Sequence, residues 1–326
     1  MDEKPFKNYS EQLEILKSRG LKLIQNGVPL RTLAEENYYN LINGYKCLFL
    51  DPTSTEEKYK DGAEFVEIVA LYRFDKEVRY ILLKELLKIE NKLRSLISYT
   101  FSEKYGNNNY LKFDNFESLR DSGITKSKIE KRAGHIHELI ASLQKDLASA
   151  IDKKEYVKHY MNKYGCVPFW VFVNCLTFGT VSRFYSLMKP AEQNSVAKYF
   201  GIKESSLIQY INIMANFRNL CAHDERLYNV RMDRTLNLPN TKWHSFIGIS
   251  TNEQGRYEYG INDFFSLIII LRELLPRKEF NSFYVKLNGQ IRILSLKLKS
   301  ITIADVYKEM GFPPNWRKIT KSPRPA

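Results

Sequence analysis

The sequence has few cysteines, and their positions indicate neither a metal site nor a redox motif. Cys47, Cys166, Cys175 and Cys221 are scattered through 326 residues without the paired spacing of such sites. We interpret them as small apolar packing residues in a reducing compartment. The sequence therefore predicts no metal and no other cofactor.

Signals for secretion and membrane insertion are also missing. The first residues, MDEKPFKNYSEQL, lack the apolar core of a secretory signal. The longest apolar run, from Phe264 to Leu271, is too short to cross a bilayer and is followed by Arg272 and Glu273. From these absences we expect a cytoplasmic protein with no membrane partner.

Acidic residues are in deficit. The chain has 50 Lys and Arg against 37 Asp and Glu, which gives a net charge of +13. Between Pro276 and Ala326 there are eleven basic residues and three acidic ones. A basic surface suits a polyanion, either nucleic acid or acidic lipid, although such a surface can also serve solubility alone. The hydrophobic content of 44% is that of a folded globular protein.

Helix-breaking residues are absent from the longest periodic stretch. Between Gly62 and Gly106 there is no proline and no other glycine, and apolar side chains recur at steps of three and four. This pattern predicts one very long helix, or two nearly continuous ones. Further helices are predicted at residues 9–25, 29–42, 116–120 and 125–150, from 168 onward, at 204–223, and from 263 to about 299.

The predicted fold class is therefore all-α, with one small exception. Within residues 245–261, the segments FIGIS and RYEYGI flank TNEQG, which predicts a small β-hairpin. The last twelve residues, NWRKITKSPRPA, are basic and contain two prolines, so we expect a mobile tail.

One segment carries residues suited to chemistry on RNA. In FRNLCAHDERLYN, residues 217–229, Arg218 and His223 stand five positions apart at the end of a predicted helix. An arginine that stays charged can neutralise a phosphorane, and an imidazole that titrates near neutrality can move protons. Because the 2'-hydroxyl of RNA is itself a nucleophile, these two groups are the minimum for metal-free cleavage.

The Arg–His spacing alone is weak support. An arginine followed by a histidine four to six residues later is expected roughly 0.8 times by chance in this composition. It occurs twice, as Arg218–His223 and as Arg132–His137. Around Lys131 and Arg132 the stretch is lysine-rich, which favours a solvated basic face that contacts RNA phosphates without chemistry. His223 instead follows an apolar helix whose C-terminus favours the imidazolium form, although a histidine that only caps the helix is the alternative.

Helix geometry restricts how the pair can act. Five residues rotate by about 140° on an α-helix, so Arg218 and His223 share no face if the helix continues through both. They converge if the helix ends between them. Otherwise a second chain, related by a two-fold axis, supplies the missing group. With one good copy of the motif per chain, we expect a homodimer.

Together with several other blocks, these residues resemble a known family. RNLCAH followed by DERLYN is similar to the HEPN ribonuclease motif of the bacterial abortive-infection AbiD/AbiF-like proteins. YSEQLEILKSRGL and NYYNLINGY resemble the family's N-terminal signature, LYRFDKEVRYILL and IENKLRSLISYTFSEKYG its long central helices, and VPFW with FVNCLTFGTVSRFYSLM its next block. The resemblance covers about residues 9–229.

The resemblance implies an all-helical, HEPN-like bundle that works as a homodimer in a toxin-like defence against phage. The implied activity is metal-independent cleavage of RNA that leaves a 2',3'-cyclic phosphate, and a flexible single strand suits the in-line attack. By the same resemblance, His223 transfers the proton, Arg218 stabilises the phosphate and Asn219 orients the site. We divide the chain into an N-terminal helical segment (1–60), a HEPN-like core (61–232) and a C-terminal helical extension with the basic tail (233–326).

The sequence leaves two interpretations open for several residues near the motif or on the long predicted helix. Arg226 either holds phosphate or pairs with a nearby acid, and Tyr228 is a candidate RNA contact beside it. Glu90 and Arg94 form an i,i+4 pair that either faces the site or is structural. The alternative to an endoribonuclease is a non-catalytic module that grips RNA, with a structured noncoding RNA as its partner.

Overall fold

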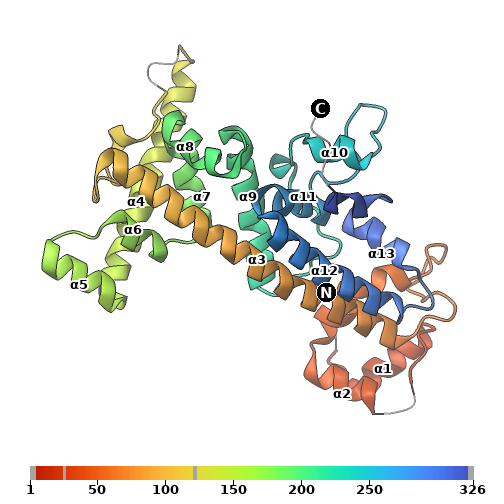
Figure 1. Ribbon diagram of the computed structural model, residues 1–326. Coiled ribbons are helices and arrows are strands. Elements are labelled where there is room, and N and C mark those ends of the chain that lie inside the picture. The colour runs from red at the N-terminus through yellow and green to blue at the C-terminus, as the bar shows by residue number, and fades with distance from the viewer. Residues whose placement is uncertain (1–4, 25–26, 120–122, 322–326) are drawn as a thin grey trace.

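A computed structural model describes residues 5–24, 27–119 and 123–321, and helices make up most of these ranges (Figure 1). The predicted all-α class is confirmed, because β pairing within the described ranges is limited to isolated bridges. The α-helices are α1 (Tyr9–Ser18), α2 (Val28–Glu35), α3 (Phe65–Tyr105), α4 (Lys126–Lys153), α5 (Glu155–Tyr164), α6 (Phe169–Phe172), α7 (Phe178–Leu187), α8 (Pro190–Phe200), α9 (Glu204–Ala222), α10 (Lys242–Ile247), α11 (Phe264–Leu274), α12 (Arg277–Ser295) and α13 (Ile303–Met310). The shorter turns are the π-helical η1 (Tyr39–Asn43) and the 3₁₀ turns η2 (Lys46–Phe49), η3 (Phe113–Asn115), η4 (Val173–Cys175), η5 (Arg234–Leu236) and η6 (Trp316–Thr320).

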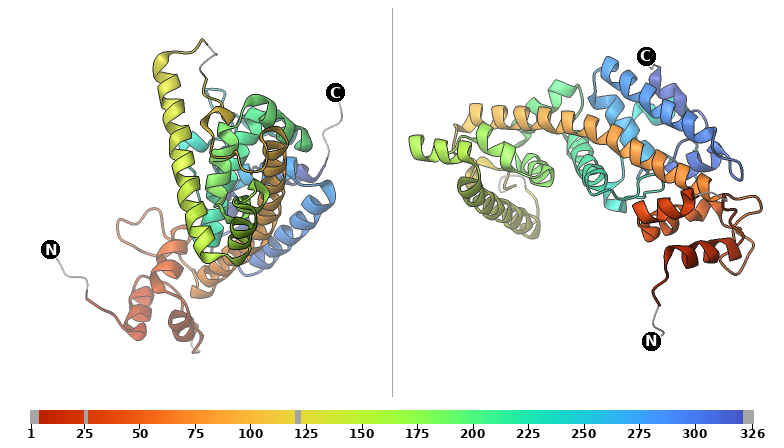
Figure 2. Two further views of the ribbon diagram at one scale, coloured as in Figure 1. Left: turned by 90° about the vertical axis from the view of Figure 1, so that its left-hand side faces the viewer. Right: turned by 90° about the horizontal axis from the view of Figure 1, so that it is seen from below.

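Helix α3 runs almost the length of the molecule, as the view from below in Figure 2 shows. Its 41 residues form one continuous helix, which confirms the prediction, and it ends at Gly106 with a φ of 84°. A rise of 1.5 Å per residue makes it about 60 Å long. Helices α6, α7 and α8 pack on its C-terminal half, α12 lies along its N-terminal half, and α9 crosses it between them (Figure 1).

The core consists of apolar faces that meet on α3 and α9. Leu207, Ile211 and Met214, which form one stripe of α9, are all buried. The longest apolar run, Phe264 to Leu271, forms most of α11 and is buried throughout. In the part of the chain that the structure describes, no helix has both the length and the apolar character to span a bilayer.

Two predicted helices in the first half of the chain have different bounds. The first ends at Ser18, because Gly20 adopts a φ of 90°, and the predicted end at Gln25 lies outside the described residues. The helix predicted at 116–120 is replaced by the 3₁₀ turn Phe113–Asn115, and Arg120 also lies outside the described residues. Loop glycines and short turns therefore limit the helices more than the periodicity indicates.

The β-hairpin predicted at 245–261 is reduced to a single antiparallel bridge between Thr251 and Tyr257. In place of its first strand, residues Lys242–Ile247 form α10. Thr241 and His244 form a capping box at its start, in which each side chain accepts a backbone N–H of the other. These bonds satisfy amides at the helix start and outweigh the weak strand preference of FIGIS.

The tail that we expect to be mobile is packed as far as Thr320. Trp316 is only 1% exposed, and Ile319 is fully buried. The Trp316 ring meets that of Phe312 edge-on, with ring centroids 4.9 Å apart. The proline-containing residues after Lys321 lie outside the described ranges. Burial of two large apolar side chains thus anchors this segment despite its basic composition.

Candidate functional site

The end of α9 places His223 on the surface. Helix α9 continues through Arg218 and Asn219 to Ala222, and the backbone N–H of His223 donates to the Asn219 carbonyl at 2.9 Å. The chain then reverses at Asp224, whose φ of 58° lies in the left-handed region that aspartate tolerates. The exposed His223 imidazole makes no hydrogen bond within the described part of the chain. It is therefore free to meet a ligand.

A buried cation on α3 fixes the turn that follows His223. Arg79 donates from Nε and Nη2 to Oδ1 of Asp224, at 3.1 and 2.6 Å, and from Nη1 to Asp75. Asp75 also accepts from the backbone N–H of Leu227 at 3.0 Å and from the Tyr45 hydroxyl at 2.6 Å. Burial raises the pKa of the Asp75 carboxyl, and the adjacent guanidinium opposes that shift. Both sides of the turn are thus attached to one cluster on α3.

Arg218 points toward α3 as well, but to a different place. Its Nε donates to Oε2 of Glu90 at 3.2 Å, and Oε1 of Glu90 accepts from Arg94 Nη2 at 2.5 Å. Arg94 is itself held by the carbonyl of Val173. Glu90 is buried, whereas the Arg218 side chain keeps 30% of its exposure. The Glu90–Arg94 pair is therefore structural, and it also orients Arg218.

The two motif residues do not converge within one chain. Because α9 continues without a break past Arg218 to Ala222, the rotation of about 140° between positions 218 and 223 is retained. Asn219 is exposed next to Arg218. His223 lines a groove to which Arg218 does not contribute.

This groove, hereafter the His223 groove, has a volume of about 690 Å³. One wall is the turn after α9, with His223, Asp224, Glu225, Arg226, Asn229 and Arg231. The other wall is η1 and its neighbours, with Tyr39, Asn40, Asn43, Gly44 and Tyr45. Arg226 Nη1 donates to the Gly44 carbonyl at 2.5 Å and so connects the two walls. Arg226 is thereby bonded to a backbone carbonyl rather than to a nearby acid.

The second wall exists because the helix predicted at 29–42 is interrupted. Helix α2 ends at Glu35, and the chain resumes at Tyr39 as the π-helical turn η1. This wall comes from NYYNLINGY, about 180 positions before the motif, and no local pattern indicates that the two segments meet. The contact between them is fixed instead by Tyr45 and Asp75 in the buried cluster.

The remaining predicted contacts lie away from the groove or beneath it. Tyr228 is buried and stacks on Tyr45, with ring centroids 5.4 Å apart, so its ring is not at the surface. Lys131 and Arg132 lie on α4, at the opposite end of α3 from α1 and α2 (Figure 1). Lys131 is exposed, whereas Arg132 donates to the carbonyls of Glu117 and Ser186 at 2.8 and 2.9 Å. Arg132 therefore connects the loop at Glu117 to the last turn of α7.

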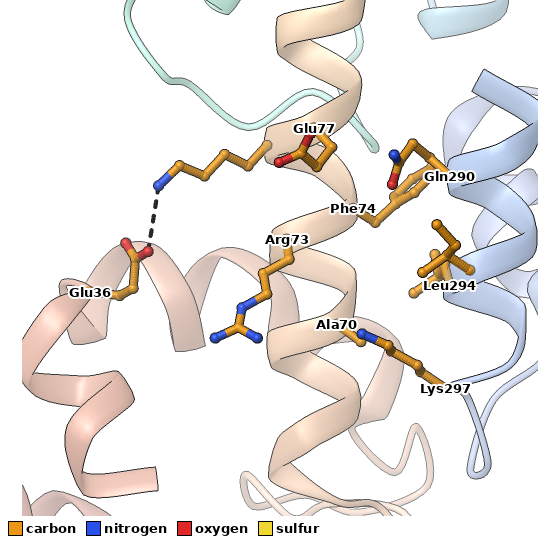
Figure 3. Close-up of a pocket in the computed structure, with 10 residues that line it drawn as sticks. Glu36, Ala70, Arg73, Phe74, Glu77, Gln290, Leu294 and Lys297 are labelled. Atoms are coloured by element: carbon orange, nitrogen blue, oxygen red, sulfur yellow. Dashed lines mark hydrogen bonds and ion pairs between the residues drawn. The ribbon is translucent and has the colours of Figure 1, made fainter. Parts of the chain in front are cut away.

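A smaller pocket of about 400 Å³ lies between α3 and α12 (Figure 3). Arg73, Lys76 and Lys297 line it together with Glu36 and Glu77, and Lys76 Nζ pairs with Glu36 at 3.5 Å. Both linings carry charges of each sign, and the pocket between α3 and α12 differs from the His223 groove in that none of the described histidines lines it.

A long stretch of the chain matches a known family. The family model described as Abi-like protein matches residues 31–229. This stretch begins in α2 and ends in the turn after His223, so it contains α3, α9 and most of both walls of the groove. No curated protein and no solved structure matches the chain. Since the match covers more than half of the sequence, this chain belongs to the Abi-like protein family.

Proposed function

We propose that this protein is a metal-independent endoribonuclease of the HEPN type, which cleaves single-stranded RNA at a site shared between two chains. Membership of the Abi-like family indicates an abortive-infection function, and the nuclease is the activity we assign to it. The observation that carries this proposal is at the end of α9. The His223 imidazole makes no hydrogen bond within the described residues, and it lies about one and a half helical turns after Arg218. The buried carboxylate of Glu90 holds Arg218 in place.

These groups suit transfer of a phosphoryl group within RNA. His223 takes the proton of the 2'-hydroxyl or returns one to the 5'-oxygen that leaves, while the 2'-oxygen attacks phosphorus. Arg218 neutralises the charge that develops on the phosphorane. Glu90 orients Arg218 before RNA binds, which reduces the entropy lost in reaching the reactive geometry. Asn219 is exposed beside Arg218 and can donate its amide to the phosphate.

The separation of Arg218 from His223 supports a shared site. Since the two side chains leave α9 about 140° apart, one phosphate does not readily contact both within a chain. A two-fold axis beside α9 brings Arg218 of one protomer opposite the partner's His223. In this arrangement the monomer is nearly inert.

The test is cleavage of a single-stranded RNA by purified variants and growth of cells that express them. We expect His223→Ala and Arg218→Ala each to abolish cleavage and toxicity while the circular dichroism spectrum is unchanged. Matched controls are His137→Ala, from the second Arg–His pair, and Arg183→Ala, which removes a more exposed ion pair with Glu138. Both controls should remain active.

Two results would contradict the proposal. Loss of wild-type cleavage on addition of EDTA would show that a metal is required. Full RNA affinity and full biological effect in His223→Ala would instead support the non-catalytic module that grips RNA.

A further inference from the structure

The His223 groove is lined by an exposed aromatic ring as well as by the imidazole. Tyr39 keeps 71% of its exposure, although the other tyrosines that line the groove, Tyr45 and Tyr72, are buried. A large exposed aromatic ring that lines a hollow is available for stacking. The stacking energy of a nucleobase on such a ring does not depend strongly on which base it is.

Several amides around Tyr39 have unused hydrogen-bonding capacity. The side chains of Asn40, Asn43 and Asn229 line the groove, and none of them makes a hydrogen bond within the described ranges. The Tyr39 hydroxyl and the His223 ring are equally free there. An amide offers both donors and an acceptor, which matches the mixed pattern on the edge of a nucleobase.

The wall that carries Tyr39 is held in position before any ligand binds. Asn37 Oδ1 accepts from the backbone N–H groups of Tyr39 and Asn40, at 2.9 and 3.3 Å. At the other end of the turn, the Gly44 carbonyl is held by Arg226. The turn itself is π-helical, a conformation that occurs frequently at functional sites.

We propose that the His223 groove is a nucleobase subsite, in which Tyr39 stacks on the base next to the cleaved phosphate and Asn43 and Asn229 contact its edge. This inference rests on the proposed function, because the subsite is the groove that His223 lines. A volume of about 690 Å³ is in the range of small-molecule pockets. The subsite selects which RNA linkage reaches His223, so it determines base preference.

The first experiment measures binding apart from cleavage. Short, fluorescently labelled 2'-O-methyl RNAs of a single base type lack the nucleophile and are titrated into the full-length protein. Tyr39→Ala should weaken binding about fivefold to 150-fold, the range that removal of one stacking ring produces. Tyr39→Phe keeps the ring and should retain affinity. Tyr99→Ala, at a similarly exposed tyrosine on α3, should have no effect.

The second experiment measures base preference. Asn43→Asp replaces an amide by a group that only accepts hydrogen bonds, so the order of affinity among the A, C, G and U oligonucleotides should change. The proposal is overturned if Tyr39→Ala and Asn43→Asp bind all four RNAs as the wild type does. It is equally overturned if the wild type binds none of them, or if the groove instead captures a peptide and excludes RNA.

The two proposals fail in different ways. Cleavage that depends on His223 but not on Tyr39 or Asn43 would contradict the subsite proposal and support the nuclease proposal. Binding that depends on Tyr39, without cleavage of unmodified RNA, would support the subsite proposal and contradict the nuclease proposal.

Discussion

Arg79 and Asp224 are separated by 145 residues, yet the guanidinium of Arg79 donates two hydrogen bonds to the carboxylate of Asp224. Arg79 is 1% exposed, so it holds the turn after His223 from inside the molecule. The same guanidinium is the only cation that contacts Asp75 among the described residues. The geometry at His223 and the stability of the fold therefore depend on one side chain.

Replacement of Arg79 by methionine should strongly destabilise the protein. The change leaves Asp75 buried without its cation, and loss of one partner of a buried pair costs about 3–5 kcal/mol in free energy of unfolding. Urea denaturation measures this cost. The control is Arg73→Met, on the exposed face of the same helix, for which a change within about 0.5 kcal/mol is expected. Equal midpoints for the two variants would contradict the role assigned to Arg79.

Substitution of Glu90 by glutamine should reduce activity, and it should also lower stability because the buried Arg94 loses its counter-charge. Glutamine can still accept a hydrogen bond from Arg94 but attracts Arg218 less, and small misplacements of such a group cost about 10- to 100-fold in rate. The measurement is kcat for RNA cleavage, below the melting temperature of the variant. Glu85→Gln is the matched control, because Glu85 is buried on α3 but pairs with the exposed Lys88. Similar rates for the two variants would show that Glu90 does not position Arg218.

A mixed dimer can test whether the site is shared. Chains that carry Arg218→Ala and His223→Ala are co-expressed with different tags and purified in two affinity steps. If each site combines Arg218 with the partner's His223, one site in this dimer is intact, and about half of the wild-type rate should return. A mixed dimer as inactive as its parents would exclude this arrangement.

The control for that experiment pairs a wild-type chain with a chain that carries both substitutions. Each shared site then lacks one group, so this dimer should be inactive. A site contained within one chain would give the opposite result in both dimers.

Stability should depend on pH through Asp263, the N-cap of α11. Burial raises the pKa of its carboxyl from the ordinary value for aspartate to about 6, although backbone N–H groups of Gly260 and Ser266 favour the charged form. An acid whose pKa is raised in the fold stabilises that fold at low pH and loses the contribution as pH rises through the folded pKa. Relative to Asp263→Asn, the wild type should lose about 2–3 kcal/mol of unfolding free energy between pH 4 and 7.

Urea denaturation at several pH values measures the difference, because asparagine can still cap the helix. The control is Asp233→Asn, the same change at an exposed N-cap. This variant should retain the decrease of unfolding free energy with pH that Asp263 causes. A wild-type curve parallel to that of Asp263→Asn would mean that Asp263 is ionised in the fold at acid pH.

The parts of the fold that depend on local sequence could be predicted. Helix α3 was predictable because its interior contains no glycine or proline, and α9 because its apolar stripe ends near His223. The packed tail was not, because Trp316 also packs on Tyr284 of α12, which is remote in the sequence and which local periodicity does not relate to it. Helix α10 was missed because FIGIS resembles a strand unless the cap at Thr241 is taken into account.

For the candidate site, the sequence identifies the chemical groups but not their surroundings. Arg218 and His223 are indicated by their spacing and by the family resemblance, and Glu90 by its pairing with Arg94. The wall that carries Tyr39 could not be predicted, because its contact with the turn depends on a cluster that is buried in the fold. One signal for that cluster was present, since Arg79 is a charged residue on the apolar stripe of α3. A charge in that position requires a buried partner.

The two residues of α3 that hold the motif, Arg79 and Glu90, have a fixed angular relationship about the helix axis. Arg79 and Glu90 are eleven residues apart, which corresponds to about 16 Å along the helix axis and to a rotation that returns within about 20° of its start. Both side chains therefore project from the same face of α3. A single residue inserted between them would rotate one side chain by about 100° about the helix axis relative to the other. It would release either Arg218 or the Asp224 turn, although no residue of the motif itself had changed.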